Sequence, residues 1–371
     1  MRTLGIVGGG QLARMLTDAA HGLGLRVVVL DPTPESPGGQ VADMQIVGSF
    51  TDPDMIRALA AQSDVITFET ESADNETLQS VSATKPVHPS PQMLSVIKDK
   101  FAQKQFLAAH GIPTSEFSEI TTPESAEAFG RLHGYPFVLK AKRDSYDGRG
   151  NALISDADSI PAAFEKLGNR AVYAERFVPF TKELAVVAVR STTGEVALFP
   201  IVETVHKNHI CDTVTMPAPV DSSTVEEAEA LARKTLNALP GVGVCAIEMF
   251  LADRVLVNEI APRVHNSGHL TIEACESSQF EQHVRAVMEM PLGSTKMKVP
   301  AAVMLNILGT RNGPAEPKGF DELQHEPGTY VHLYGKHESR IGRKMAHITV
   351  TADTVEEARA KADALRDRVS I

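Results

Sequence analysis

The sequence has little cysteine and no tryptophan. Its 371 residues include only Cys211, Cys245 and Cys275, an odd number without a C-x-x-C spacing. Neither a disulfide framework nor a thiolate zinc site is therefore predicted. Few, unpaired cysteines are typical of proteins in a reducing compartment, so we expect a cytoplasmic location.

Long apolar runs and an excess of basic residues are also missing. No apolar run approaches the ~18 residues that cross a membrane, and the chain begins with a strand pattern instead of the basic start of a signal peptide. The 36 Lys and Arg against 47 Asp and Glu give a formal charge of −11. We expect no membrane and no nucleic-acid partner, because an anionic surface would need a broad basic footprint. Any anionic ligand must be held by local basic clusters.

The first segment has the pattern of a β-α-β unit. Residues 4–7 and 25–31 read as buried strands, and a glycine turn at residues 8–13 leads into a helix that runs to about residue 21. The turn contains G-x-G-x-x-A, and Asp31 follows it at the spacing of a dinucleotide-binding fingerprint. An NAD-dependent oxidoreductase is one interpretation. The other is structural, because a tight turn from strand to helix needs glycine whatever ligand binds.

A further strand at residues 65–68 ends in Glu69 and Glu71. Ligands of open parallel sheets bind beyond the carboxyl ends of the strands, where the glycine turn also lies. Gln11, Leu12 and Glu71 could therefore line one pocket, although solvated loop acids are the alternative. A proline-rich turn at residues 86–91 precedes a charged helix, so we place a domain boundary after residue 97.

Residues 136–142 read as a strand that ends in lysines, and a glycine-bearing loop at residues 143–151 follows it. A lysine beside such a loop can neutralise and cover phosphates without a G-x-x-x-x-G-K-[ST] motif, which the chain lacks. A plain β-hairpin turn is the alternative interpretation of the loop.

Two glutamates flank a predicted β-hairpin. If Asp253 and Arg254 form a two-residue loop, Glu248 lies directly opposite Glu259. Carboxylates on Cβ atoms roughly 5 Å apart favour a cation between them, and hard oxygen ligands select Mg²⁺ or Mn²⁺. A loop longer by one residue would instead place Glu248 opposite Asn258. An edge hairpin with two solvated glutamates is the alternative.

The last part of the chain has a local excess of basic residues. Lys336, Arg340, Arg343 and Lys344 are opposed only by Glu338, in a chain that is acidic as a whole. Such a cluster is suited to a phosphate monoester, while a solvated hairpin is the alternative.

The order of these features resembles the ATP-grasp superfamily over essentially the whole chain. Residues 8–12, 146–150 and above all 258–269 (NEIAPRVHNSGH) are similar, more narrowly, to the 5-(carboxyamino)imidazole ribonucleotide synthase family. The resemblance implies an α/β protein in which an ATP-grasp fold follows a Rossmann-like parallel-sheet domain and precedes a small C-terminal region. The implied domains are residues 1–97, a lid subdomain at 98–178, and residues 179–371 for the metal and nucleotide subdomain with the C-terminal region.

The resemblance also implies an activity. Members of the family use ATP and bicarbonate to carboxylate 5-aminoimidazole ribonucleotide in purine biosynthesis, through carboxyphosphate, and release ADP and phosphate. Whether the amine is carboxylated directly or by released CO₂ stays open. Relatives are commonly dimers, so a homodimer is expected.

Site roles follow from the same resemblance. The expected metal ligands are Glu248 and Glu259, with Asn258 nearby. The expected phosphate contacts are Lys100, Lys140 and the loop of Ser145, Tyr146, Asp147, Gly148, Arg149, Gly150 and Asn151. The expected adenine, ribose and neighbouring contacts are Glu175, Arg176, Phe177, Val178, Glu183 and His206. The expected catalytic residues are Arg263, His265, Asn266, Tyr146 and Lys336, with Arg263 on bicarbonate. The expected ribonucleotide contacts are Gln11, Leu12, Glu71, Tyr146, Arg149, Arg263, Lys336, Arg343 and Lys344.

Two positions depart from the pattern of relatives. Many ATP-grasp enzymes have asparagine two residues after the second metal glutamate, where this chain has Ala261, so Asn258 or Asn266 could replace it. Lys100 stands where relatives often have arginine, which keeps the charge but loses the bidentate fork. Three alternatives stay open: an ATP-grasp ligase for another amine, such as a formate-using glycinamide ribonucleotide enzyme, an NAD-dependent oxidoreductase, and a silent nucleotide-binding regulator.

Overall fold

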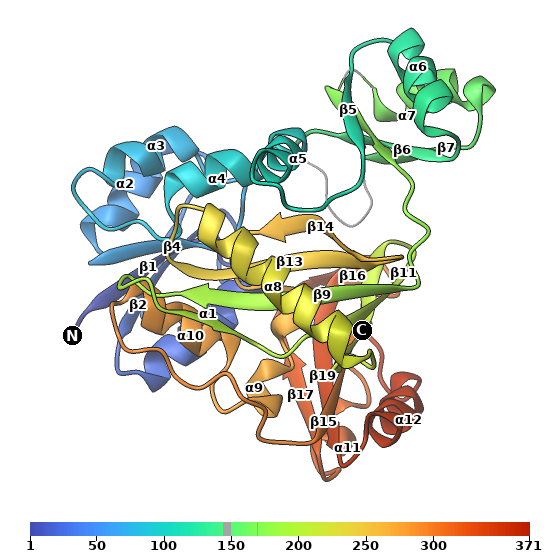
Figure 1. Cartoon of the computed structure of the whole chain (residues 1–371). Coiled ribbons are helices and arrows are strands. Elements are labelled where there is room, and N and C mark those ends of the chain that lie inside the picture. Colours follow the sequence, from blue (N-terminus) through green and yellow to red (C-terminus); the bar gives the residue numbers. More distant parts are fainter. Residues whose placement is uncertain (144–149, 169) are drawn as a thin grey trace.

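The computed structural model describes residues 1–143, 150–168 and 170–371 (Figure 1). The predicted loop residues Ser145, Tyr146, Asp147, Gly148 and Arg149 lie outside the described residues. Figure 1 shows a first α/β domain, a small lid that projects from the rest, and a large sheet that continues into the C-terminal region. The described helices include none long and apolar enough to cross a membrane.

The first domain is a parallel sheet with the strand order β3-β2-β1-β4. Its elements are β1 (Thr3–Val7), α1 (Gln11–Gly22), β2 (Arg26–Asp31), β3 (Met44–Val47), α2 (Pro53–Ala61), β4 (Val65–Phe68), α3 (Asn75–Val81) and α4 (Pro91–Ile97). Helix α1 packs on one face of the sheet, and α2 and α3 pack on the other. Strands β1 and β4 are therefore buried throughout, which explains their continuous apolar sequences.

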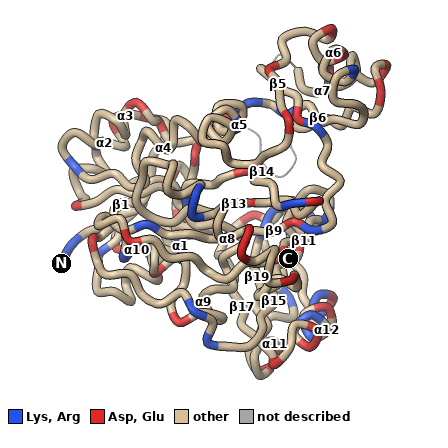
Figure 2. The backbone as a smooth tube through the Cα atoms, viewed as in Figure 1, with Lys and Arg blue, Asp and Glu red and all other residues tan. Residues whose placement is uncertain are grey.

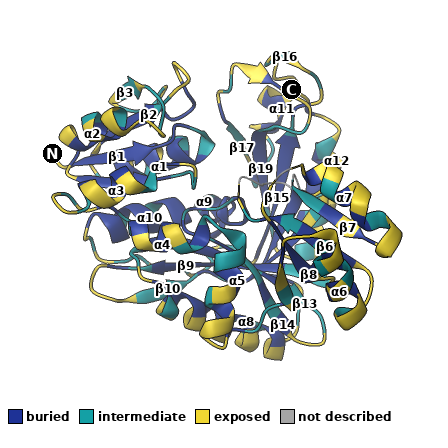
Figure 3. Ribbon diagram, turned by 90° about the horizontal axis from the view of Figure 1, so that it is seen from above, coloured by how far each residue is buried: buried dark blue, intermediate teal, exposed yellow. Residues whose placement is uncertain are grey.

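The lid is an antiparallel sheet with the order β5-β8-β6-β7 and its own apolar core. The segment contains α5 (Lys100–Ala109), β5 (Phe117–Ile120), α6 (Pro123–His133), β6 (Phe137–Ala141), β7 (Asn151–Ile154), η1 (Ala157–Ser159), α7 (Ile160–Leu167) and β8 (Val172–Arg176). Helices α6 and α7 pack on the sheet, whereas α5 packs against β14 of the large sheet. Figure 3 shows yellow, exposed faces on α6 and α7 and dark blue, buried strands beneath them.

The large sheet has the order β14-β13-β9-β11-β12-β15-β19-β17, and β10 pairs with β9. Its strands and helices are β9 (Lys182–Arg190), β10 (Val196–Leu198), β11 (Val202–Lys207), β12 (Ile210–Met216), α8 (Ser222–Ala238), β13 (Gly243–Leu251), β14 (Val255–Ala261), η2 (Asn266–Gly268), α9 (Thr271–Ala274), α10 (Gln279–Val287), β15 (Ala301–Leu308), β17 (Thr329–Leu333), β19 (Lys344–Ala352) and α12 (Val355–Arg366). The C-terminal region adds β16 (Gly313–Pro314), α11 (Phe320–Leu323) and β18 (Glu338–Ser339). Helix α8 covers one face, while α10 fills the space between the other face and α1. The C-terminal strands therefore extend the sheet that carries the Glu248/Glu259 hairpin. Figure 2 shows Lys and Arg interspersed with Asp and Glu over the described chain.

A buried histidine joins the first domain to the large sheet. His283 of α10 accepts a hydrogen bond at Nδ1 from the backbone N–H of Val244 (3.1 Å), so its Nε2 carries the proton and donates to Thr67 Oγ1 (2.7 Å). Burial lowers the pKa of His283 to about 3. The ring therefore stays neutral in the folded protein.

The His283 contact predicts a pH-dependent contribution to stability. An unfolded histidine has a pKa of about 6.5, so the contribution is complete above that pH and is lost as the pH falls towards the folded value. In urea unfolding, the advantage of wild type over His283→Gln should shrink by ~2 kcal/mol between pH 7.5 and pH 5. The exposed His325 supplies the control, because His325→Gln should leave the pH dependence unchanged. Parallel pH profiles for wild type and His283→Gln would contradict the assignment.

Candidate active site

The β13–β14 hairpin sets Glu248 opposite Glu259, as predicted, but by a different route. Leu251 pairs with Val255, so the loop has three residues instead of the predicted two. A bulge next to Met249 then shifts the register by one. Asn258 is the extra residue, and both Asn258 and Glu259 oppose Glu248. The bulge therefore restores the pairing that the longer loop would have lost.

Each hairpin carboxylate has its own side-chain partner. Lys100 Nζ of α5 lies 2.9 Å from Glu259 Oε2, and His265 Nε2 lies 3.1 Å from Glu248 Oε1. Burial would raise the pKa of Glu248, but the contact with His265 outweighs it and holds the pKa below the usual range. Asn258 directly precedes Glu259. Its side-chain Oδ1 is buried and has no hydrogen-bond partner among the described residues. The hairpin therefore carries two opposed glutamates and, next to Glu259, an asparagine whose side-chain oxygen has no partner in the described chain.

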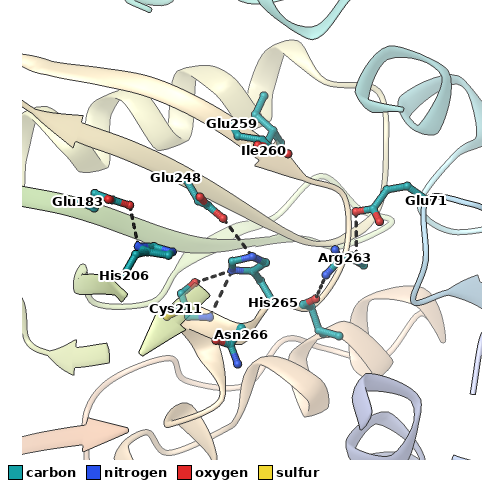
Figure 4. Close-up of polar contacts among 12 residues, drawn as sticks. Glu71, Glu183, His206, Cys211, Glu248, Glu259, Ile260, Arg263, His265 and Asn266 are labelled. Atoms are coloured by element: carbon teal, nitrogen blue, oxygen red, sulfur yellow. Dashed lines mark hydrogen bonds and ion pairs between the residues drawn. The ribbon is translucent and has the colours of Figure 1, made fainter. Parts of the chain in front are cut away.

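A second Glu–His pair lies on the neighbouring strands. Glu183 Oε2 of β9 is 2.8 Å from His206 Nδ1 of β11, and β9 pairs with β13. Figure 4 shows Glu183 and Glu248 on adjacent strands, with their carboxylates directed to His206 and His265. Partial burial would lower the pKa of His206, but the Glu183 carboxylate outweighs it and raises the pKa. The predicted ribose contact thus lies beside the predicted metal ligand.

Arg263 ties the hairpin to the first domain. Its Nε lies 2.8 Å from Glu71 Oε1, and its Nη1 donates to the carbonyl of Val264 at 3.1 Å. The Glu71 carboxylate keeps the pKa of Arg263 raised in spite of its burial. Figure 4 shows Glu71 reaching Arg263 from the first domain. The predicted substrate residue of one domain and the predicted bicarbonate residue of the other are therefore in contact.

The backbone N–H groups of the glycine turn donate to side chains of the same domain. The N–H of Gly9 donates to Asp31 Oδ2 (2.8 Å), the N–H of Ala13 donates to Glu69 Oε2 (3.0 Å), and Gly10 N–H donates to Glu69 Oε1. Burial raises the pKa of Glu69 to about 7. In a dinucleotide site these N–H groups would face the pyrophosphate. Their occupation by two carboxylates argues against the oxidoreductase interpretation.

A buried cluster joins the lid to α5. Lys104 Nζ lies 2.8 Å from Glu175 Oε1, and Lys140 Nζ lies 2.7 Å from Glu175 Oε2. The side chains of Lys104 and Glu175 are 2% and 3% exposed. Lys104 was not among the predicted residues, although its place one helical turn after Lys100 was a usable signal. The predicted adenine residue Glu175 thus has its side chain directed to two lysines.

The predicted C-terminal residues lie at the start of β19, against the first domain. Lys336 Nζ donates to the carbonyl of Lys344 (2.6 Å), and Arg343 donates to the carbonyl of Glu338 (2.7 Å). The side-chain amide of Gln40, in the first domain, donates to the carbonyl of Gly335 at 2.7 Å. The segment with Lys336 therefore adjoins the domain that carries Gln11 and Glu71.

The remaining predicted residues have varied surroundings. Asn266 forms a reciprocal amide pair with Asn306, at 3.0 and 2.6 Å, and is 7% exposed. At the end of β8, the backbone N–H of Arg176 donates to the Glu116 carbonyl, and Phe177 is 41% exposed. Leu12 is a core residue. The other predicted site residues that the structure describes are Gln11, Gly150, Asn151 and Val178.

Family models match three successive parts of the chain. They are a ribonucleotide synthetase preATP-grasp domain (residues 1–98), an ATP-grasp domain (105–280) and a phosphoribosylaminoimidazole carboxylase C-terminal domain (302–361). A Brucella melitensis protein named N5-carboxyaminoimidazole ribonucleotide synthase is 41% identical over 94% of this chain and 95% of its own. A crystal structure of N5-carboxyaminoimidazole ribonucleotide synthetase from Thermotoga maritima has a TM-score of 0.91 and 43% identity, covering 100% of this chain and 99% of that one. The chain belongs to the N5-carboxyaminoimidazole ribonucleotide synthase family.

Other relatives agree with this family. The synthase from Aspergillus clavatus was solved in complex with ADP and 5-aminoimidazole ribonucleotide, and has a TM-score of 0.92 with 40% identity over 99% of this chain and 98% of that one. A phosphoribosylaminoimidazole carboxylase from Ogataea methanolica is 43% identical over 95% of this chain but only 67% of its own length. The predicted family and fold class are confirmed. The domain limits 1–97, 98–178 and 179–371 stay predictions.

The occupied glycine turn predicts a packing conflict. A Cβ atom added at Gly10 would lie 2.7 Å from Glu69 Oε1, whereas one added at Gly22 of the same segment meets nothing within 4 Å. Gly10→Ala should lower the free energy of unfolding by ~1–3 kcal/mol in urea titrations, because relief of the clash breaks hydrogen bonds to Glu69. Gly22→Ala should change it by no more than ~1 kcal/mol. In a Glu69→Ala background the cost of Gly10→Ala should largely vanish, and an unchanged cost would rule out Glu69 as its cause.

Proposed function

We propose that the chain uses ATP and bicarbonate to carboxylate 5-aminoimidazole ribonucleotide, giving N5-carboxyaminoimidazole ribonucleotide, ADP and phosphate. The observation that carries the proposal is the opposed pair Glu248 and Glu259 with Arg263 four residues beyond Glu259. Family membership supports the substrate, since a relative from Aspergillus clavatus was solved with ADP and 5-aminoimidazole ribonucleotide. The hairpin would then be the place where ATP and the carboxyl donor meet.

The donor set fits a magnesium ion that arrives with ATP. In the described ranges, no three His, Cys, Asp or Glu side chains are grouped to hold a metal ion. Mg²⁺ normally takes one or two protein carboxylates and completes its coordination with water and substrate phosphates. Glu248, Glu259 and the unpartnered Oδ1 of Asn258 would supply the protein ligands. When bound, the ion neutralises charge on the phosphoryl oxygens.

Asn258 is the better candidate for the asparagine that Ala261 replaces. Its side-chain oxygen has no partner in the described chain, whereas Asn266 is engaged with Asn306. We therefore assign Asn266 to positioning the segment after the hairpin and Asn258 to the metal ligands.

The basic residues divide between the two substrates. Lys100 and Lys140 would bind the ATP phosphates after leaving Glu259 and Glu175, with the loop at residues 145–151 over them. Glu183 and His206 would lie at the ribose side of the nucleotide. The ribonucleotide would be held by Lys336, Arg343 and Lys344, with Gln11 and Glu71 from the first domain. Tyr146 and Arg149 keep their predicted roles at the same substrate.

The reaction requires two transfers. A bicarbonate oxygen attacks the γ-phosphorus, the bond from that phosphorus to the bridging oxygen of ADP breaks, and carboxyphosphate forms. The exocyclic amine then attacks the carbonyl carbon, and phosphate leaves with the bond electrons. Arg263 would stabilise the negative charge on the carboxyl group. His265, which contacts Glu248, would lie beside Arg263. Carboxylation by CO₂ released from carboxyphosphate is the second route open to the same site.

The hairpin assignment predicts the effect of a single substitution. Glu259→Gln removes one metal ligand, so ADP release that depends on bicarbonate and 5-aminoimidazole ribonucleotide should fall by at least ~100-fold. A coupled assay for ADP measures it. Glu281→Gln, which removes a surface partner of Arg285, is the matched control and should keep wild-type activity. Full activity in Glu259→Gln would disprove the site.

Substrate screening separates this function from a related ligase. Phosphate release with formate and glycinamide ribonucleotide, but not with bicarbonate and the aminoimidazole substrate, would favour the formate-using alternative. A homodimer and a cytoplasmic location stay predictions from the sequence, and sedimentation analysis would test the first.

A further inference from the structure

Glu175 is a buried carboxylate shared by two lysines, and its two sides differ. Oε1 contacts Lys104 (2.8 Å) and accepts a hydrogen bond from Ser115. Oε2 contacts Lys140 (2.7 Å) and lies 3.4 Å from the Tyr173 hydroxyl. The Lys104 side chain is 2% exposed, whereas that of Lys140 is 15% exposed. Lys104 is therefore fully buried, whereas Lys140 is partly exposed to solvent.

Lys104 is held from several directions. Its Nζ also donates to Thr114 Oγ1 (2.7 Å) and lies 3.3 Å from Ser115 Oγ. Thr114 in turn donates to the carbonyl of Val257, next to the bulge in the β13–β14 hairpin. A lysine with this many fixed partners is not placed to follow a ligand. Among the described residues, Lys140 on strand β6 of the lid contacts Glu175, and its side chain is more exposed than that of Lys104.

We propose that Lys104 is a positioning residue for ATP, as the permanent counter-ion of Glu175 that allows Lys140 to leave for the nucleotide phosphates. This rests on the proposed function of Lys140 as a phosphate ligand. A buried carboxylate that loses its only cation is strongly destabilised. With Lys104 in place, Glu175 keeps a cation when Lys140 departs, so the move does not leave an unpaired buried charge.

The electrostatics of the cluster support this role. Burial alone would raise the pKa of Glu175, but the two lysines outweigh it and hold the pKa below its usual range. Glu175 is thus ionised, and its contact with Lys104 opposes the lowering that burial imposes on the pKa of Lys104. Because Glu175 belongs to the lid and Lys104 to α5, the same pair also links the lid to the large sheet through Thr114.

The test measures binding of a non-hydrolysable ATP analogue with Mg²⁺ by calorimetry, without the other substrates. Lys104→Met should raise the Kd by at least ~10-fold, because Glu175 then retains Lys140. The double variant Lys104→Met with Glu175→Gln removes the trap and should bind within ~3-fold of Glu175→Gln alone, the reference that carries any loss of the predicted adenine contact at Glu175. Lys234→Met, an exposed lysine of α8, is the control and should bind like wild type.

Two outcomes overturn the proposal. One is an unchanged Kd in folded Lys104→Met. The other is a double variant whose Kd exceeds that of Glu175→Gln by ~10-fold or more, whether or not Lys104→Met folds. In active enzyme, Lys104→Met should raise KM for ATP and leave KM for the ribonucleotide within ~2-fold. Because nucleotide binding needs no carboxylation, failure of the proposed reaction would leave this test intact.

Discussion

Two carboxylates that face each other across neighbouring strands are the constraint on which the site depends. Like charges in this position repel, so Glu248 and Glu259 need cations close by. Lys100 of α5 supplies a cation to Glu259, and His265, which follows the hairpin, places its Nε2 against Glu248. Helix α5, the large sheet and the loop after β14 therefore converge on the hairpin. In the proposed function, ATP and its metal ion would enter there and exchange these contacts for phosphate and metal contacts.

The first domain contacts this place through an ion pair, and the N–H groups of its glycine turn donate to carboxylates of the same domain. Glu71 reaches Arg263, while Glu69 fills the donors of the glycine turn. A Rossmann-like topology thus presents Glu71 to the segment that follows the hairpin. The G-x-G-x-x-A pattern predicts the turn correctly. The groups that accept hydrogen bonds from its N–H groups, however, are two carboxylates of the same chain, Asp31 and Glu69.

Periodicity and turn patterns predict the local elements well, because they report on neighbours in sequence. Strand β4 and the parallel topology of the first domain follow the predicted pattern, and Glu248 pairs with Glu259. The three-residue loop and its compensating bulge at Asn258 were not predictable, since two opposite shifts leave the same pairing. Contacts between distant segments were equally hidden: Asn266 pairs with Asn306, and Lys104 meets Glu175 only after the lid folds back onto α5.

Attack of bicarbonate on the γ-phosphorus is the step that unites the two halves of the proposed site. Turnover with ¹⁸O-labelled bicarbonate tests it directly, with the released phosphate analysed by ³¹P NMR at short reaction times. One bicarbonate oxygen should remain on phosphorus in every phosphate, by either route of carboxylation, because the bond that breaks later joins that oxygen to carbon. Phosphate without label would mean that water attacks ATP, and would contradict the assignment of the hairpin as the junction of ATP and bicarbonate.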